Sequence, residues 1–475
     1  MENEKQLTFF GGPVVSFLPI ISFISVAIYV ALSLESATIQ GMWVGILAGI
    51  IATFFLAKDK QLYGDTVIDG MSDKIALLPV ACWIFAGIFA TVLRSSGMVN
   101  GILWAAYHTG ATGTPFIVVT FLSSAVFATA AGTGFGTIAA GMGVLYPAGV
   151  LLGCHPALLA GAIVGGGAFG DNMAPISDTT ISSAASQGTD VGGVVRSRLR
   201  YALLSAGISL VLMVGLSLVY GGNMAELPYD QLASQMNPKG LLMMIPAGIT
   251  IYFAIKTGNI IYATIIGIVT GSVIAILSGL NTVSGILSVE NGALISGVAG
   301  WMADLSILVL LLVAGIRVMN VGGGAELLVN SVKKFISSAM GVEAASATLS
   351  LIFSALMSIN APAILAVGLS FAKPLGEKFK IHPYRRANII DATACTLVYT
   401  LPWSAGLLFA SGLSKSASET FAGVPFLSPV QLMPWVIYAW VLLVVIYTAI
   451  ITGWGRKFED KDGNEVDTEE EANAA

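Results

Sequence analysis

Long apolar runs, separated by short polar segments, occupy almost the whole sequence. A helix needs roughly 20 apolar residues to cross the hydrocarbon core of a bilayer, and most of the runs approach or exceed that length. The pattern therefore predicts an all-α polytopic membrane protein. The predicted spans and helical regions are 14–34, 41–57, 74–93, 115–153, 157–186, 201–220, 241–255, 262–279, 304–319, 345–375, 387–408 and 430–452.

The second half of this pattern repeats the first at an offset of 227 residues. Alternatively, this agreement between the two halves arises because prolines cluster at the ends of membrane helices. We expect a first repeat over 1–220, a linker over 221–239, a second repeat over 240–455 and an acidic cytoplasmic tail over 456–475. The matched pairs are Pro19 and Pro246, Gly141 and Gly368, Pro147 and Pro374, Pro156 and Pro383, Pro175 and Pro402, and Ser177 and Ser404.

Basic residues indicate how the two repeats are oriented. Arg196, Arg198 and Arg200 follow the span 157–186, whereas a second basic cluster, 378–386, precedes the matching span 387–408. Cytoplasmic loops are enriched in Lys and Arg. If both clusters are cytoplasmic, the matching spans run in opposite directions, which predicts inverted repeats with both termini in the cytoplasm. Inverted repeats are typical of secondary transporters.

An inverted arrangement needs an odd number of crossings in each half. Regions 115–153 and 345–375 satisfy this as re-entrant hairpins, giving about five spans plus one hairpin per repeat. The number of crossings per half is also odd if both arms of each hairpin cross the membrane. Fully crossing arms therefore stay open as an alternative to re-entrant hairpins. The hairpin tips would be Gly132–Thr137 and Ser358–Pro362. Candidate substrate-lining residues at these tips are Thr133, Thr137, Ser358 and Asn360.

Polar residues inside the span 157–186 predict a broken helix and an ion site. Asp171 and Asp178 lie on either side of Pro175, which removes a backbone donor and interrupts a helix. Ionisable groups at membrane depth normally face a cavity and serve function. We expect both carboxylates to bind Na⁺ and protons. Three hydroxyls, those of Ser177, Thr179 and Thr180, would supply further ligands or would instead cap the second half-helix.

The second half carries a smaller set of candidates. Asp391 is expected to handle an ion or proton, or alternatively to pair with Arg385 or Arg386. Asp304 and Arg317 are expected to be scaffold residues. Further candidates for lining a substrate site are Asn172, Thr400 and Ser404.

Composition excludes a soluble protein and most enzymes. Charged residues make up 10% of the 475 residues, apolar residues 56%, and the mean hydropathy is +0.85. The net charge of −5 comes largely from the tail, which we expect to be disordered. The three histidines form no HExxH motif and no phosphate-binding glycine loop is present, so neither a resident cofactor nor a nucleic-acid partner is expected.

The stretch Gly167-Ala-Phe-Gly-Asp-Asn-Met-Ala-Pro-Ile-Ser-Asp-Thr-Thr180 resembles the NhaC family of Na⁺/H⁺ antiporters, within the wider ion transporter superfamily. Ala174 stands where members of the family commonly have serine. The resemblance implies inverted repeats, re-entrant hairpins and broken helices. It also implies a multi-pass protein of the cell (inner) membrane that contacts the lipid bilayer and carries Na⁺ and H⁺.

We therefore expect a secondary active transporter that exchanges Na⁺ and protons by alternating access. The alternative is a Na⁺- or H⁺-coupled carrier of an amino acid or small carboxylate, including malate/lactate-type exchange. A passive channel and an enzyme are less consistent with the compact polar cluster. The sequence leaves the organic solute, the stoichiometry and a homodimeric state open.

Overall fold

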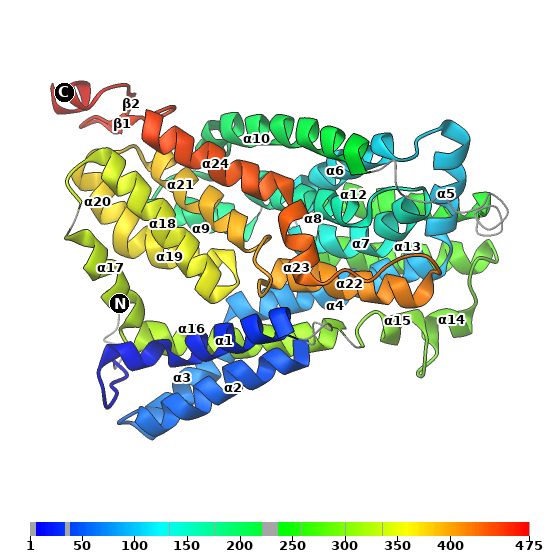
Figure 1. The fold of residues 1–475 in the computed structure, drawn as a ribbon, viewed down its shortest axis with the longest axis horizontal. Helices are drawn as coiled ribbons and strands as arrows, with labels where there is room; N and C mark the ends of the chain where they lie inside the picture. Colours follow the sequence, from blue (N-terminus) through cyan, green and yellow to red (C-terminus); the bar gives the residue numbers. More distant parts are fainter. Residues whose placement is uncertain are drawn as a thin grey trace.

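The computed structural model describes residues 6–33, 39–132, 134–175, 177–220, 236–257, 259–299, 301–334 and 336–474. Most of these residues are helical, which confirms the predicted helical class (Figure 1). Of the predicted linker 221–239, residues 221–235 lie outside the described residues, as does the candidate Thr133. The linker therefore stays a prediction.

The helices of the first half follow the predicted segments, with additional short helices between them. They are η1 Pro13–Phe17, α1 Leu18–Ser33, α2 Ile39–Leu56, α3 Lys60–Ser72, α4 Lys74–Ser95, α5 Met98–Thr109, α6 Thr114–Ala131, α7 Gly134–Leu151, α8 Pro156–Met173, α9 Asp178–Gln187 and α10 Val191–Tyr220.

The helices of the second half follow in a similar order. They are η3 Pro238–Met243, α12 Met244–Thr257, α13 Ile260–Leu277, α14 Val283–Leu287, α15 Ala293–Ser296, α16 Trp301–Val321, α17 Gly324–Lys333, α18 Ala339–Met357, α19 Asn360–Val367, the π-helical turn η4 Gly368–Ala372, α20 Lys373–Lys378, α21 Pro383–Leu397, α22 Ala405–Thr420, α23 Pro429–Leu432, η5 Met433–Trp435 and α24 Ile437–Thr452.

Helices α1, α2, α10, α16 and α24 run roughly along the long axis of the view (Figure 1). The hairpin of α18 to α20 lies left of the centre of this view, whereas α6, α7 and α8 lie right of it. Each arm of the first hairpin, α6 and α7, has 18 residues, a length of about 27 Å at 1.5 Å per residue.

Several predicted spans are interrupted. The predicted break near Pro175 is confirmed, since α8 ends at Met173 and α9 begins at Asp178. A second gap separates α21 from α22. The pairs formed by Ile84–Ser95 with Met98–Thr109 and by Ser306–Val321 with Gly324–Lys333 are each bent by 60°. Within the described chain, four helices are long and apolar enough to cross a membrane, or seven if each bent pair counts as one span. The predicted ten crossings stay a prediction.

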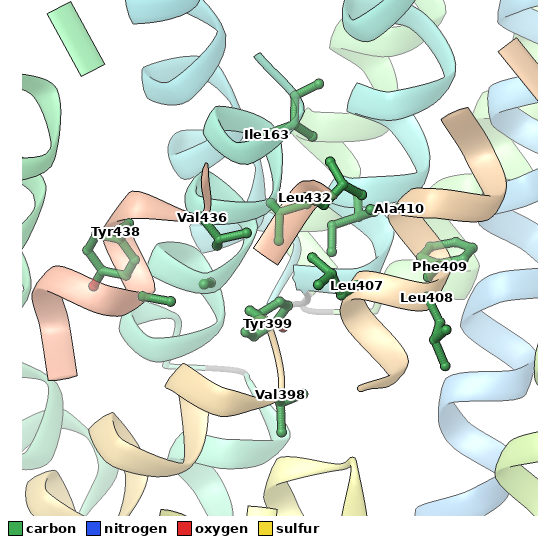
Figure 2. Close-up of a cluster of buried hydrophobic side chains, with 14 of the residues drawn as sticks. Ile163, Val398, Tyr399, Leu407, Leu408, Phe409, Ala410, Leu432, Val436 and Tyr438 are labelled. Carbon is green, nitrogen blue, oxygen red and sulfur yellow. The ribbon is translucent and has the colours of Figure 1, made fainter. Parts of the chain in front are cut away.

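Nearly all side chains of α8 are buried, and its glycines allow α6 to approach closely. A Cβ added at Gly170 would lie 2.1 Å from the Cβ of Ala128. Figure 2 shows part of the surrounding hydrophobic cluster, in which Ile163 of α8 lies near side chains from α22 and from the segment that leads into α24.

The acidic tail is ordered, which corrects the expectation of disorder. Strand β1 (Phe458–Glu459) pairs antiparallel with β2 (Glu465–Val466), and the short helix α25 (Glu469–Ala474) follows. The backbone N–H of Glu459 donates to the carbonyl of Lys380 at 2.8 Å, and that of His382 donates to the carbonyl of Lys457 at 3.0 Å. These bonds hold the tail against the start of α21, and composition alone does not reveal them.

Candidate functional site

Asp171 occupies the last turn of α8 and is 3% exposed. Its Oδ1 accepts a hydrogen bond from Ser177 Oγ at 2.8 Å. Its Oδ2 accepts one from Asn360 Nδ2 and one from the Tyr399 hydroxyl, both at 2.8 Å. None of the ion pairs among the described residues includes Asp171. Its carboxylate is thus surrounded by neutral donors and left without a cation.

Three separate breaks in the helices deliver these donors. Ser177 precedes α9 after the first break, and Tyr399 follows α21 at the second. Asn360 is the first residue of α19, directly after the turn that ends α18. Ser358 makes that turn possible by adopting a φ of 57°. The predicted hairpin tip therefore reaches Asp171 through Asn360.

The hydroxyls of Ser177 and Thr179 bond to Asp171 and not to the free N–H groups at the start of α9. Ser177 is at the N-cap position of α9, yet its side chain makes no capping hydrogen bond. The Ser177 and Thr179 hydroxyls lie 3.0 Å apart, and Thr179 donates to the backbone carbonyl of Asp171 at 3.1 Å. The alternative that Ser177 caps the half-helix is therefore wrong.

Asp178 begins α9 and is partly exposed. The N-terminus of a helix favours a negative charge, so α9 stabilises the Asp178 carboxylate.

Asp391 forms a second buried cluster with Arg198, and both side chains are 0% exposed. Arg198 Nη2 lies 2.6 Å from Asp391 Oδ2, and the Ser183 hydroxyl donates to the same oxygen at 2.9 Å. The predicted alternative partners of Asp391 were wrong. Arg385 instead pairs with Glu343 at 2.9 Å, and the side chain of Arg386 does not pair with Asp391.

Sequence reasoning missed Arg198, which was expected at the cytoplasmic surface with Arg196 and Arg200. The helix α10 begins ten residues before the predicted span, at Val191, so it includes all three arginines. Only Arg198 of the three is buried. A signal was available in the small and polar residues that share its helical face. The buried residues along α10 are Val194, Arg198, Tyr201, Ala202, Ser205, Ser209, Met213 and Ser217.

Arg198 also joins the two broken spans through its other donors. Its Nη1 donates to the backbone carbonyl of Asn172 and, at 3.2 Å, to Thr180 Oγ1. Its Nε donates to Asn388 Oδ1 at 3.0 Å. Thr180 therefore belongs to the Arg198 cluster and not to the donors around Asp171.

Among the described residues, Asn172 and Tyr438 are buried polar side chains that lack a partner. Both amide atoms of Asn172 and the hydroxyl of Tyr438 make no hydrogen bond, although each residue is fully buried. A buried polar group that lacks a partner costs roughly 1–3 kcal/mol. Asn172 directly follows Asp171, which places this cost beside the candidate site.

The remaining candidates lie outside the Asp171 site. Thr400 and Ser404 donate to the backbone carbonyls of Thr396 and Leu401. Ser358 donates to the carbonyl of Trp403 at 3.4 Å. Thr137 lines a separate cavity of about 230 Å³. The structure thus brings Ser177, Thr179 and Asn360 to Asp171 and leaves these four apart. The Tyr399 hydroxyl was missed because no sequence pattern fixes where a tyrosine side chain points.

Two cavities lie between α16 and other helices. One, of about 350 Å³, includes Asp73, Arg317, Asn320 and Glu326 in its wall, together with residues of α19. The other, of about 370 Å³, includes Arg94, Asp304, Lys415 and Glu419. Asp304 and Arg317 therefore face different cavities. The Arg94 guanidinium donates to Ser416 Oγ at 3.0 Å.

Comparison with known proteins identifies the family. The profile of the Na⁺/H⁺ antiporter family matches residues 6–218 and 233–454. The malate-2H⁺/Na⁺-lactate antiporter of Bacillus subtilis is 23% identical, over 96% of this chain and 97% of its own length. The NhaC Na⁺/H⁺ antiporter of Alkalihalophilus pseudofirmus is 25% identical, over 76% of this chain and 82% of its own.

A third relative, the arginine/ornithine antiporter ArcD of Halobacterium salinarum, is 26% identical over 97% of this chain and 95% of its own. The named relatives are transporters and not enzymes, and they differ in what they exchange. Because the family profile covers nearly the entire sequence, the chain belongs to the Na⁺/H⁺ antiporter family and is an integral membrane transporter.

Proposed function

We propose that this protein exchanges Na⁺ and protons by alternating access, with Asp171 and Asp178 as the groups that bind them. One observation carries the proposal: the buried Asp171 carboxylate accepts three hydrogen bonds from neutral donors and has no cationic partner among the described residues. A buried charge without a partner is costly. Either a bound Na⁺ or a proton removes that cost.

The chemistry of the donors suits both ions. A hydroxyl donates one hydrogen bond and also offers lone pairs. Ser177 and Tyr399 can therefore donate to the carboxylate or turn an oxygen toward a cation, while Asn360 adds an amide oxygen. Alkali and alkaline-earth cations prefer oxygen ligands. Asp178 would complete the set, with Thr179 holding Ser177 in place.

Inverted repeats would supply the alternating access. The first residues of α4 and α16, 74 and 301, are 227 apart, as are those of α8 and α21, 156 and 383, and of α9 and α22, 178 and 405. The bent pairs within 84–109 and 306–333 both measure 60°. The equal spacing of these helix starts and the equal bend angles support a common ancestral unit in the two halves.

Contacts between the starts of α10 and α21 support the cytoplasmic placement of the basic clusters and of the C-terminal tail. The Tyr384 hydroxyl donates to the Asp190 carboxylate, so the start of α21 lies beside the start of α10. Both basic clusters are thus at one end of the molecule, and the tail is attached there through Lys380. The positive-inside rule places that end in the cytoplasm, with the protein in the cell (inner) membrane.

A coupled carrier of an amino acid or carboxylate is the second candidate. It is favoured by the charges around the 370 Å³ cavity, where Arg94 and Lys415 accompany Asp304 and Glu419. A solute that bears both an ammonium and a carboxylate group would match these charges. The relatives named for malate/lactate and arginine/ornithine exchange are consistent with this candidate.

Reconstituted protein distinguishes the candidates. We expect Na⁺ added outside acidic proteoliposomes to drive proton efflux without any organic solute, and Asp171→Asn to abolish that flux. Efflux that requires L-malate, L-lactate or L-arginine inside the vesicles would favour the carrier. Unchanged exchange by Asp171→Asn would contradict the proposed ion site.

A further inference from the structure

Arg198 is a buried cation that bonds to three different helices. It contacts the end of α8 through the Asn172 carbonyl, α9 through Thr180 and Ser183, and α21 through Asn388 and Asp391. It belongs to α10, which is a continuous helix of 30 residues. A cation at this depth is thus held by an unbroken helix between the two interrupted spans.

The pair of Arg198 and Asp391 is connected to the proposed ion site through two side chains. Cys395 Sγ donates to Asp391 Oδ1 at 3.4 Å, and Asn360 Nδ2 lies 3.6 Å from the same sulfur. Asn360 Nδ2 also donates to Asp171 at 2.8 Å. The charge of Asp391 therefore acts on the same amide that binds Asp171.

We propose that Arg198 is a positioning residue that balances the charge of Asp391 through their buried ion pair, so that Asp171 and Asp178 are left as the groups that exchange Na⁺ for protons. This inference rests on the proposed function and deepens it. It assigns Asp391 to a fixed pair with a protein cation, in place of the ion-binding role that its sequence position suggested.

The balance of charges is the physical basis. Asp171, Asp178 and Asp391 with Arg198 amount to two uncompensated negative charges, both on α8 and α9. The other titratable groups that face the pair are Cys395 of α21 and Tyr438 of α24. Removing one member of a buried ion pair leaves a charge without a partner, whereas removing both leaves the net charge of the site unchanged.

A double-mutant cycle on reconstituted full-length protein tests the inference. The variants are Arg198→Gln, Asp391→Asn and the double variant, with Na⁺-driven proton flux measured from pH 6 to 9. We expect each single variant to lose at least tenfold in rate. We expect the double variant to exceed both single variants by at least fivefold and to keep the wild-type pH midpoint. The midpoint of Arg198→Gln alone should move, since Asp391 is then left without its cationic partner beside the site.

Arg198→Lys keeps the positive charge while losing the guanidinium geometry. It should keep the wild-type pH midpoint even if its rate falls, which separates the charge from the shape of the side chain. Each variant is checked for a single peak in size-exclusion chromatography. If the double variant fails this check because it is misfolded, the pH midpoint of Arg198→Lys tests the inference by itself. A midpoint that moves in Arg198→Lys, or wild-type rate and midpoint in Asp391→Asn, would overturn the inference.

The pair of Glu343 and Arg385 offers a matched control, because it is also buried and also involves α21. Glu343→Gln and Arg385→Gln should lower thermal stability without moving the pH midpoint. The outcome also separates two failures. If Asp171→Asn abolishes exchange but the cycle shows no coupling, only the role of Arg198 fails; if Asp171→Asn exchanges normally, the ion site itself fails.

Discussion

Tyr399 and Asp171 are 228 residues apart in the sequence and are joined by a hydrogen bond of 2.8 Å in the core. The bond connects the end of α8 to the turn after α21, and so joins the two interrupted spans at one carboxylate.

Tyr399→Phe removes this bond and keeps the ring. A hydrogen bond to a charged group contributes about 1.5–3 kcal/mol, so we expect the apparent Michaelis constant for Na⁺ to rise about tenfold. Proton flux against Na⁺ concentration measures this. Tyr447→Phe is the control, because Tyr447 bonds Thr348 at the exposed edge of α24. Equal constants for wild type and Tyr399→Phe would remove Tyr399 from the site.

Gly134→Ala should disturb the proposed ion site, because the new methyl group would project from the first hairpin onto Tyr399. A Cβ at Gly134 would lie 2.2 Å from the Tyr399 hydroxyl and 2.9 Å from the Gly167 carbonyl. Overpacking of this kind costs about 1–3 kcal/mol, and here it displaces the Tyr399 donor. We expect at least a tenfold loss of exchange. Gly215→Ala has no atom within 4 Å of the new carbon and should exchange normally. Normal exchange by Gly134→Ala would show that the hairpin tip can move away from Tyr399 without disturbing the site.

Asn172→Ala should make the resting protein more stable and less active. The unpartnered amide of Asn172 is removed, and its burial costs roughly 1–3 kcal/mol. We expect a higher melting temperature in Na⁺-free detergent solution and slower exchange. Asn388→Ala is the comparison, since the Asn388 amide is bonded to Arg198 and Ser197 and its loss should lower the melting temperature. A lower melting temperature for Asn172→Ala would indicate that its amide is satisfied.

Glu343→Gln should destabilise the protein near the start of α21. The Glu343 carboxylate pairs with Arg385 and with Arg456, at 2.9 and 2.8 Å. Breaking a buried pair costs about 3–5 kcal/mol, so a clear fall in melting temperature is expected. Asp462→Asn, at an exposed residue of the tail, should leave the melting temperature within a degree or two of wild type. Similar melting temperatures for the two variants would contradict the buried position of Glu343.

Sequence reasoning predicted the segment that forms the candidate site because the signals there are local. Pro175 lacks a backbone donor and lies at the break between α8 and α9. Charged residues next to such a break at membrane depth usually serve function. Asn360 was found in the same way, from helix-breaking residues at the tip of a hairpin.

The partners of these residues depend on tertiary packing. Whether Asp391 meets Arg385, Arg386 or Arg198 is decided by the position of α10 against α21, and no spacing in the sequence records it. Arg198 was counted with two exposed arginines because the positive-inside rule treats a cluster as a unit. The burial pattern along α10 separates them, and it becomes visible only once the helix is known to begin at Val191.

The tail has a practical consequence for work with this protein. Lys380 donates through its Nζ to the carbonyl of Ala472 at 2.6 Å and accepts from Glu459 at 2.8 Å. A fluorescent protein or affinity tag fused to the last residue would therefore pull on the segment that precedes α21, the helix that carries Asp391 and leads to Tyr399. Purification handles attached at the other end of the chain avoid that strain.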